Sequence, residues 1–99
     1  MNVKEILKLY RQEKIESMVK HNMLDAETLE KVKIIDEIFE NTERANYRGC
    51  KVPIVRMFYR DRLSMSECAN TVHVCERQAY RIRDDCVNWL SDMLDNPPS

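Results

Sequence analysis

The sequence predicts an all-α protein, because three features of its 99 residues favour helices joined by short connections. The chain holds one glycine and three prolines, whereas a β protein needs many turn residues. Its apolar residues recur at spacings of three and four along most of the length. Two capping-box patterns, Asn2 with Glu5 and Ser64 with Glu67, indicate helix starts. We therefore expect five helices and no sheet.

The first segment, residues 1–46, is expected to form an N-terminal helical hairpin that serves packing or oligomerisation. One amphipathic helix is predicted over 3–21, where Lys14 is the single polar residue in the apolar stripe. Asp25 is a favourable N-cap for a second helix, predicted over 25–45. Two such helices can pack antiparallel through their apolar sides.

The second segment, residues 47–96, follows a break in the pattern that contains the only glycine, Gly49. Pro53 suits the first turn of a helix. Three helices are predicted in this segment, over residues 53–62, 65–71 and 76–94. The last of them carries an apolar stripe, and Trp89 beside it is expected to pack against the first segment. Residues 97–99 are expected to be a tail.

Residues 65–84 fit the spacing of a helix-turn-helix motif, in which two helices cross around a short turn. The side chains expected to fill the wedge between these helices are Cys68, Ala69, Val72, Val74, Ala79 and Ile82. The turn position, which adopts positive φ, holds His73 where glycine is usual. Cys75, a weak acceptor, stands at the N-cap of the second helix. The expected fold is thus an N-terminal helical hairpin followed by a three-helix helix-turn-helix unit.

Charge is unevenly distributed along the chain, although the net charge is −1. Residues 47–83 carry eight basic residues against three acidic ones, whereas residues 84–99 carry four aspartates and no basic residue. Most of the basic residues are arginines, whose guanidinium groups form paired hydrogen bonds to phosphate or guanine. The alternative explanation is a solvated surface with ion pairs inside the molecule.

A helix that enters the DNA major groove needs polar side chains on its free face. The candidate base-contacting residues are Glu76, Arg77, Gln78, Tyr80 and Arg81. The candidate phosphate-contacting residues are Arg56, Arg60, Arg62, Ser64, Ser66 and Arg83. The sequence shows no nucleophile–base pair, no glycine-rich phosphate loop and no pair of catalytic carboxylates. We therefore expect no enzyme activity, no catalytic residue, no cofactor and no metal.

The stretch 55–69, continued by 72–82, resembles region 4 of bacterial sigma factors. In that family a helix ending in an aromatic residue leads through a short turn and a Leu-Ser pair into the helix-turn-helix. Residues 50–93 are also similar to small phage late-gene transcriptional regulators of the ArpU/RinA type. The resemblance implies that the residues facing the DNA groove are Glu76, Arg77, Tyr80 and Arg81.

The expected function is a sequence-specific, DNA-binding transcription regulator, encoded by a phage or mobile element and located in the cytoplasm. Its expected partners are double-stranded DNA, RNA polymerase as a further candidate, and a second copy of the chain in a homodimer. No membrane partner is expected, since no apolar run approaches roughly 18 residues. Two alternatives stay open: a small terminase-type DNA-packaging subunit, and a helical adaptor or anti-sigma-like interaction protein without DNA binding.

The four cysteines include no C-x-x-C pair and are expected to be free thiols. Cys68 and Cys86 fall on apolar stripes and should be buried. Cys50 is expected to react first with a thiol reagent.

Overall fold

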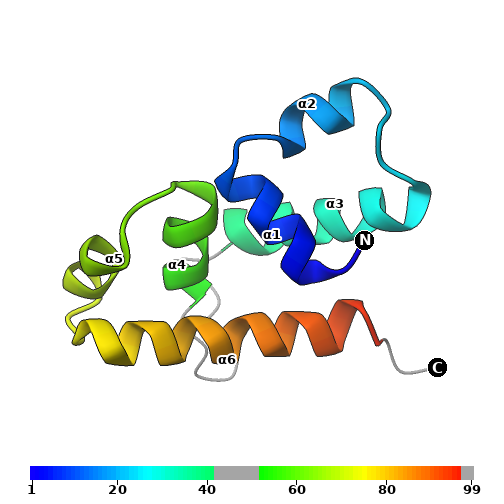
Figure 1. Ribbon diagram of the computed structural model, residues 1–99. Helices are drawn as coiled ribbons and strands as arrows, with labels where there is room; N and C mark the ends of the chain where they lie inside the picture. Colours follow the sequence, from blue (N-terminus) through cyan, green and yellow to red (C-terminus); the bar gives the residue numbers. More distant parts are fainter. Residues whose placement is uncertain (42–51, 97–99) are drawn as a thin grey trace.

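The computed structural model describes residues 1–41 and 52–96, and within these ranges the chain forms only helices. Their order is α1 (Val3–Arg11), α2 (Ile15–Lys20), α3 (Ala26–Glu40), α4 (Val52–Val55), the π-helix η2 (Arg56–Arg60), α5 (Met65–Thr71) and α6 (Glu76–Leu94). Figure 1 shows the long helix α6 along one side of the molecule, α5 beside its first turns, and α1, α3 and α4 stacked against its length. None of the described helices combines the length and apolar character that a membrane crossing requires.

Helix starts coincide with the capping side chains that the sequence indicates. Backbone N–H groups of the first turns donate to three of them: Glu5 to Asn2 at 2.9 Å, Thr28 to Asp25 at 2.8 Å, and Glu67 to Ser64 at 3.1 Å. Cys75 precedes α6 without a side-chain capping bond, as its weak acceptor sulfur predicts. The helices predicted over 65–71 and 76–94 are confirmed to the residue.

The single helix predicted over 3–21 is wrong, because the chain breaks between α1 and α2. Glu13 has a positive φ of 60°, and the backbone N–H of Lys14 donates to the carbonyl of Leu9 at 2.9 Å. These features form a Schellman motif, which ends a helix and redirects the chain. The described part of the first segment, residues 1–41, therefore holds three helices in place of the predicted two-helix hairpin.

The remaining two predicted helices, over 25–45 and 53–62, also differ from the structure in their bounds. The helix predicted over 25–45 ends earlier, at Glu40, and residues 42–45 of that prediction lie outside the described residues. The helix predicted over 53–62 changes to π-helical geometry, with the backbone N–H of Asp61 donating to the carbonyl of Arg56 at 3.1 Å. Five residues separate this donor and acceptor, so the last turn is wider than an α-helical one.

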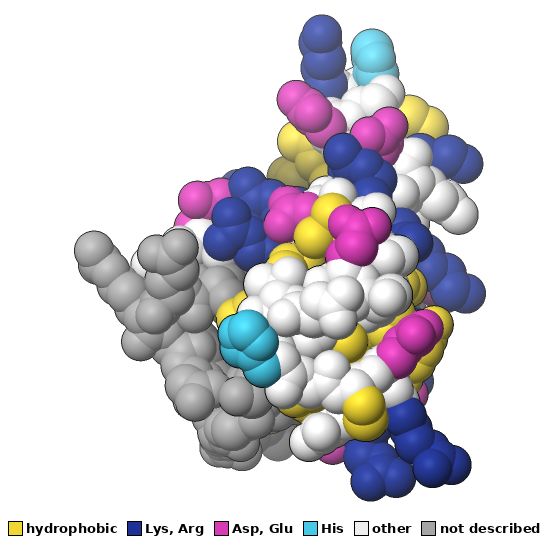
Figure 2. Space-filling view, turned by 90° about the vertical axis from the view of Figure 1, so that its left-hand side faces the viewer, with side chains coloured by type: hydrophobic (Ala, Val, Ile, Leu, Met, Phe, Trp, Pro, Cys, Tyr) yellow, Lys and Arg dark blue, Asp and Glu magenta, His cyan; other side chains and the backbone are white. Residues whose placement is uncertain are grey.

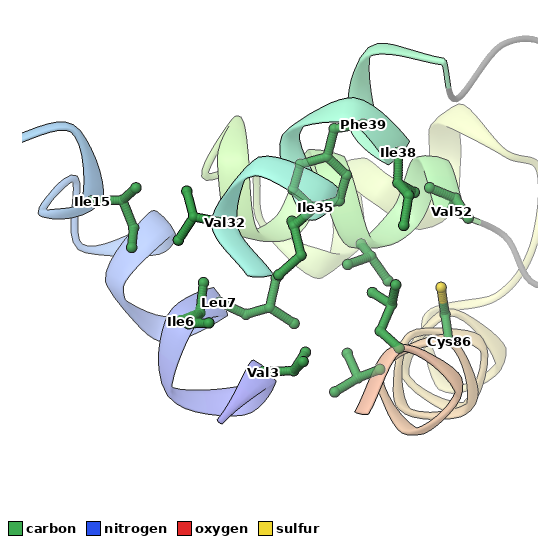
Figure 3. Packing of buried hydrophobic residues seen from close by; sticks show 13 residues of the cluster. Val3, Ile6, Leu7, Ile15, Val32, Ile35, Ile38, Phe39, Val52 and Cys86 are labelled. Atoms are coloured by element: carbon green, nitrogen blue, oxygen red, sulfur yellow. The ribbon is translucent and has the colours of Figure 1, made fainter. Parts of the chain in front are cut away.

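The main hydrophobic core draws side chains from both predicted segments. Its buried members are Val3, Ile6, Leu7, Ile15, Val32, Ile35, Ile38, Phe39, Val52, Val55, Cys86, Val87 and Leu90. Figure 3 shows the α1 and α3 side chains facing one another, with Val52 and Cys86 approaching from the second segment. Trp89 packs against this cluster, as predicted. A fully buried aliphatic or aromatic side chain contributes about 1.5–3 kcal/mol, so the shared core stabilises the two segments together.

Asp95, just after α6, makes polar contacts with Lys31 of α3 and with Val3 of α1. The ammonium Nζ of Lys31, a buried side chain, lies 2.9 Å from Oδ1 of Asp95. The hydrogen bond to Asp95 raises the pKa of Lys31. Asp95 also accepts a hydrogen bond from the backbone N–H of Val3 at 3.2 Å, in the first turn of α1. The start of α1, the middle of α3 and the end of α6 are therefore held together.

Candidate nucleic-acid interface

Helices α5 and α6 pack against each other around a second hydrophobic cluster. The structure brings all six side chains of the predicted wedge into this cluster: Cys68, Ala69 and Ala79 are buried, and Val72, Val74 and Ile82 are partly buried. Ile54 of α4 and Met65 of α5 complete the buried part. Burial raises the pKa of the Cys68 thiol. Between the two helices, His73 adopts the positive φ that the motif requires, at 60°.

The five candidate base-contacting residues all lie in the first two turns of α6, and all are exposed: Glu76, Arg77, Gln78, Tyr80 and Arg81. Arg77 and Arg81 are one helical turn apart and project from the same face. Neither guanidinium group has a hydrogen bond or ion pair within the described part of the chain. Figure 2 looks onto this end of the molecule, and Lys and Arg side chains project from its lower edge.

Three of the candidate phosphate-contacting arginines, Arg56 and Arg60 of η2 and Arg62 just after it, make contacts inside the molecule instead. Arg56 Nη1 donates to the carbonyl of Phe39 at 3.2 Å, Arg60 Nη2 lies 2.6 Å from Glu40 Oε1, and Arg62 Nη2 lies 2.8 Å from Glu13 Oε1. The hydrogen bond from Arg60 lowers the pKa of the Glu40 carboxyl. These arginines therefore link the second segment to the first.

The remaining three candidates for phosphate contact lie on either side of the α5–α6 pair. Ser64 and Ser66 are exposed at the start of α5, where the Ser64 hydroxyl caps the helix. Arg83 is much less accessible, with 20% of its side chain exposed. Its guanidinium carbon lies 5.0 Å from the ring centroid of Phe58 and 5.0 Å from that of Tyr80, and it donates to Asp84 Oδ1 at 2.8 Å.

Arg11 is a residue that the sequence interpretation missed. Its guanidinium carbon lies 4.0 Å from the ring centroid of Phe58, and its Nη1 donates to the carbonyls of Phe58 and Leu63, the latter at 3.2 Å. Arg11 thus ties the end of α1 to the connection that leads into α5. No signal in the sequence indicates this role, because Arg11 falls in the middle of the helix predicted over 3–21; in the structure it lies in the last turn of α1, where a basic residue also suits the helix dipole.

The charge of the exposed α6 surface changes sign along the helix. Beyond Arg81 the exposed side chains include Asp84, Asp85 and Asp92. The exposed basic side chains of α6, Arg77 and Arg81, are therefore confined to its first two turns, and carboxylates, which repel anions, follow them.

An open groove of about 830 Å³ lies on another side of the molecule, between α1, α2, α3 and the end of η2. Its apolar lining includes Ile15, Val19, Leu29 and Val32. The groove lining also includes Glu16 and Asp61, which have no ion pair among the residues that the structure describes.

In the described ranges no three His, Cys, Asp or Glu side chains are grouped closely enough to bind a metal ion. No family model, curated protein or solved structure matches this chain.

Proposed function

We propose that the chain is a sequence-specific, double-stranded DNA-binding transcription regulator that places the first two turns of α6 in the major groove. The exposed and unpaired state of Arg77 and Arg81 carries this proposal. A guanidinium group without an intramolecular partner keeps its hydrogen-bond donors available for guanine O6 and N7. The other arginines that the structure describes between residues 52 and 83 have partners inside the molecule: Arg56, Arg60, Arg62 and Arg83.

The arrangement of α5 and α6 supports a helix-turn-helix interpretation. The positive φ of His73, the wedge of six apolar side chains and the exposed face of α6 occur at the spacings that the motif needs. In such motifs the second helix lies in the groove and the first crosses the DNA backbone. The exposed Ser64 and Ser66 at the start of α5 are therefore the better candidates for phosphate contacts than Arg56 and Arg60.

The proposed role in transcription rests on the resemblance to sigma factor region 4 and to phage late-gene regulators. On that basis, RNA polymerase is the proposed protein partner and a phage or mobile element the proposed source. A homodimer is proposed because two half-sites multiply a modest affinity for one site. A small terminase-type subunit would bind DNA with the same face but assemble into a ring, so the oligomer number separates these two proposals.

The proposal is tested by selecting duplexes from a random pool and measuring affinity for the selected site by fluorescence anisotropy. Arg77→Ala and Arg81→Ala should each weaken binding by roughly 1–3 kcal/mol and relax the sequence preference. Lys33→Ala, which removes an exposed positive charge from α3, is the matched control and should change affinity little. No selected sequence and no binding at low salt would refute DNA recognition.

The groove beside α2 favours a second candidate function, the binding of a helical segment from a partner protein. Its apolar lining, which includes Ile15, Val19, Leu29 and Val32, suits the apolar face of an amphipathic helix. Leu29→Glu would block this function without touching α6. Loss of DNA-independent partner binding in that variant, with DNA affinity unchanged, would assign the interaction to the groove.

A further inference from the structure

Tyr80 is an exposed aromatic side chain on the part of α6 that we propose to enter the groove. It is 42% exposed, and the other large hydrophobic side chains that are exposed in the described part of the chain, Met1, Val19 and Met23, lie in the first segment. Tyr80 stands three residues after Arg77 and one before Arg81, so the three side chains share one side of the helix. Its hydroxyl has no hydrogen bond within the described residues.

The ring of Tyr80 is held in place by the guanidinium group of Arg83. The guanidinium carbon of Arg83 lies 5.0 Å from the ring centroid of Tyr80 and an equal 5.0 Å from that of Phe58. Arg83 is fixed in turn by two hydrogen bonds to Asp84 Oδ1, at 2.8 and 3.0 Å. Phe58 also packs under the guanidinium group of Arg11, at 4.0 Å. A ring held by such cation–π contacts loses little side-chain entropy when it meets a ligand.

The major groove presents one apolar group to such a ring. Guanine, adenine and cytosine show hydrogen-bond donors and acceptors there, whereas thymine adds its C5-methyl group. An aromatic side chain on the contacting face gains by covering that methyl group, because the contact removes apolar surface from water.

We infer that Tyr80 selects thymine, through contact between its ring and the C5-methyl group, next to the guanines contacted by Arg77 and Arg81. This inference rests on the proposed function and specifies the base chemistry that the same face recognises. Arg83 is then a positioning residue for Tyr80, and it does not neutralise a phosphate.

The experiment replaces each thymine of the selected duplex in turn by deoxyuridine, which removes only the methyl group. At one thymine the wild-type protein should bind about fourfold more weakly, the effect of one buried methylene-sized group, about 0.8 kcal/mol. Cytosine at that position should also bind weakly, and 5-methylcytosine should recover part of the loss because it restores the methyl group.

Protein variants assign the effect to the proposed residues. Tyr80→Ala should bind thymine and deoxyuridine duplexes equally, whereas Tyr80→Phe should keep the discrimination. Arg77→Ala, the control, should lower overall affinity and still prefer thymine. Arg83→Gln should reduce the preference while leaving the salt dependence of binding unchanged; a fall in the salt slope by about one unit would show a phosphate contact instead.

Failure of the inference can be told apart from failure of the proposed function. Specific DNA binding that is insensitive to every deoxyuridine replacement, or a thymine preference that survives in Tyr80→Ala, overturns the role of Tyr80 and leaves the proposed function standing. Absence of specific DNA binding by the wild-type protein overturns both.

Discussion

The backbone N–H of Val74 donates to the carbonyl of Ala69 at 3.0 Å, across the turn that separates α5 from α6. His73, inside this turn, donates to the carbonyl of Asn70 at 3.4 Å and has a φ of 60°. The pair of bonds forms a Schellman motif, and the side chains of Val74 and Ala69 meet in the same hydrophobic cluster. This turn therefore sets the direction in which α6 leaves α5.

The cost of a positive φ at His73 should appear in the stability of variants. His73→Gly should raise the free energy of unfolding relative to His73→Ala by about 1 kcal/mol, because glycine has no Cβ to clash in this conformation. His73→Val should be the least stable of the series, since a β-branched residue fits this region worst. Urea titration followed by circular dichroism measures the order. Equal stability of the three variants would show that the turn does not hold a positive φ in solution.

The N-cap of α6 can be improved at Cys75. A serine oxygen there would accept a hydrogen bond from the first turn of α6, which the cysteine does not do. Cys75→Ser should therefore unfold with a free energy higher by about 1 kcal/mol than Cys75→Ala, which removes the thiol without adding a cap. Thermal unfolding of both variants gives the comparison, and an equal melting temperature would contradict the capping geometry.

The ion pair between Arg60 and Glu40 makes part of the stability depend on pH. Because Arg60 lowers the pKa of Glu40 in the folded state, the pair stabilises the fold above the ordinary carboxyl pKa of 4.5. This stabilisation is lost as the pH falls through the lower, folded-state pKa. Arg60→Gln should thus be less stable than wild type at pH 7, and the difference should shrink toward pH 3. Arg81→Gln, whose arginine has no such partner among the described residues, should show no comparable pH dependence.

Arg11 should matter for stability and not for direct DNA contact. Arg11→Ala removes the donor to the carbonyls of Phe58 and Leu63 and the cation above the Phe58 ring. Loss of a charged hydrogen-bond donor of this kind costs roughly 1.5–3 kcal/mol. Lys8→Ala, an exposed change one turn earlier on α1, should stay within about 0.5 kcal/mol of wild type. Chemical denaturation of the two variants distinguishes these outcomes, and similar values would show that Arg11 is not anchored.

The burial of each cysteine determines how accessible its thiol is to a labelling reagent. Cys68 and Cys86 are buried, as predicted, and Cys75 is exposed. Cys50, expected to react first, lies outside the described residues.

Local signals in the sequence were sufficient to predict α5 and α6. The Ser64 cap, the turn at His73 and the apolar stripe of α6 act over a few residues each, so α5 and α6 could be predicted to the residue. The wedge residues followed from the same spacing, and the structure brings them into one cluster.

Contacts distant in the sequence could not be predicted in the same way. The helix break at Glu13 needs a left-handed residue, and glutamate gives no local sign of that conformation. Arg60 pairs with Glu40 and Arg62 pairs with Glu13, and both acids lie in the first segment. The distribution of charge along the sequence therefore could not show which arginines form ion pairs within the molecule. The widening of the chain to a π-helix at 56–60 likewise has no marker in the sequence.

The central claim, that the first two turns of α6 contact DNA, is tested most directly by a nuclear magnetic resonance titration with the selected duplex. Backbone amide signals of residues 76–81 and of Ser64 and Ser66 should shift or broaden as DNA is added, and those lining the groove, such as Val19 and Leu29, should stay in place. Changes confined to the groove residues, or none at all at low salt, would contradict the account.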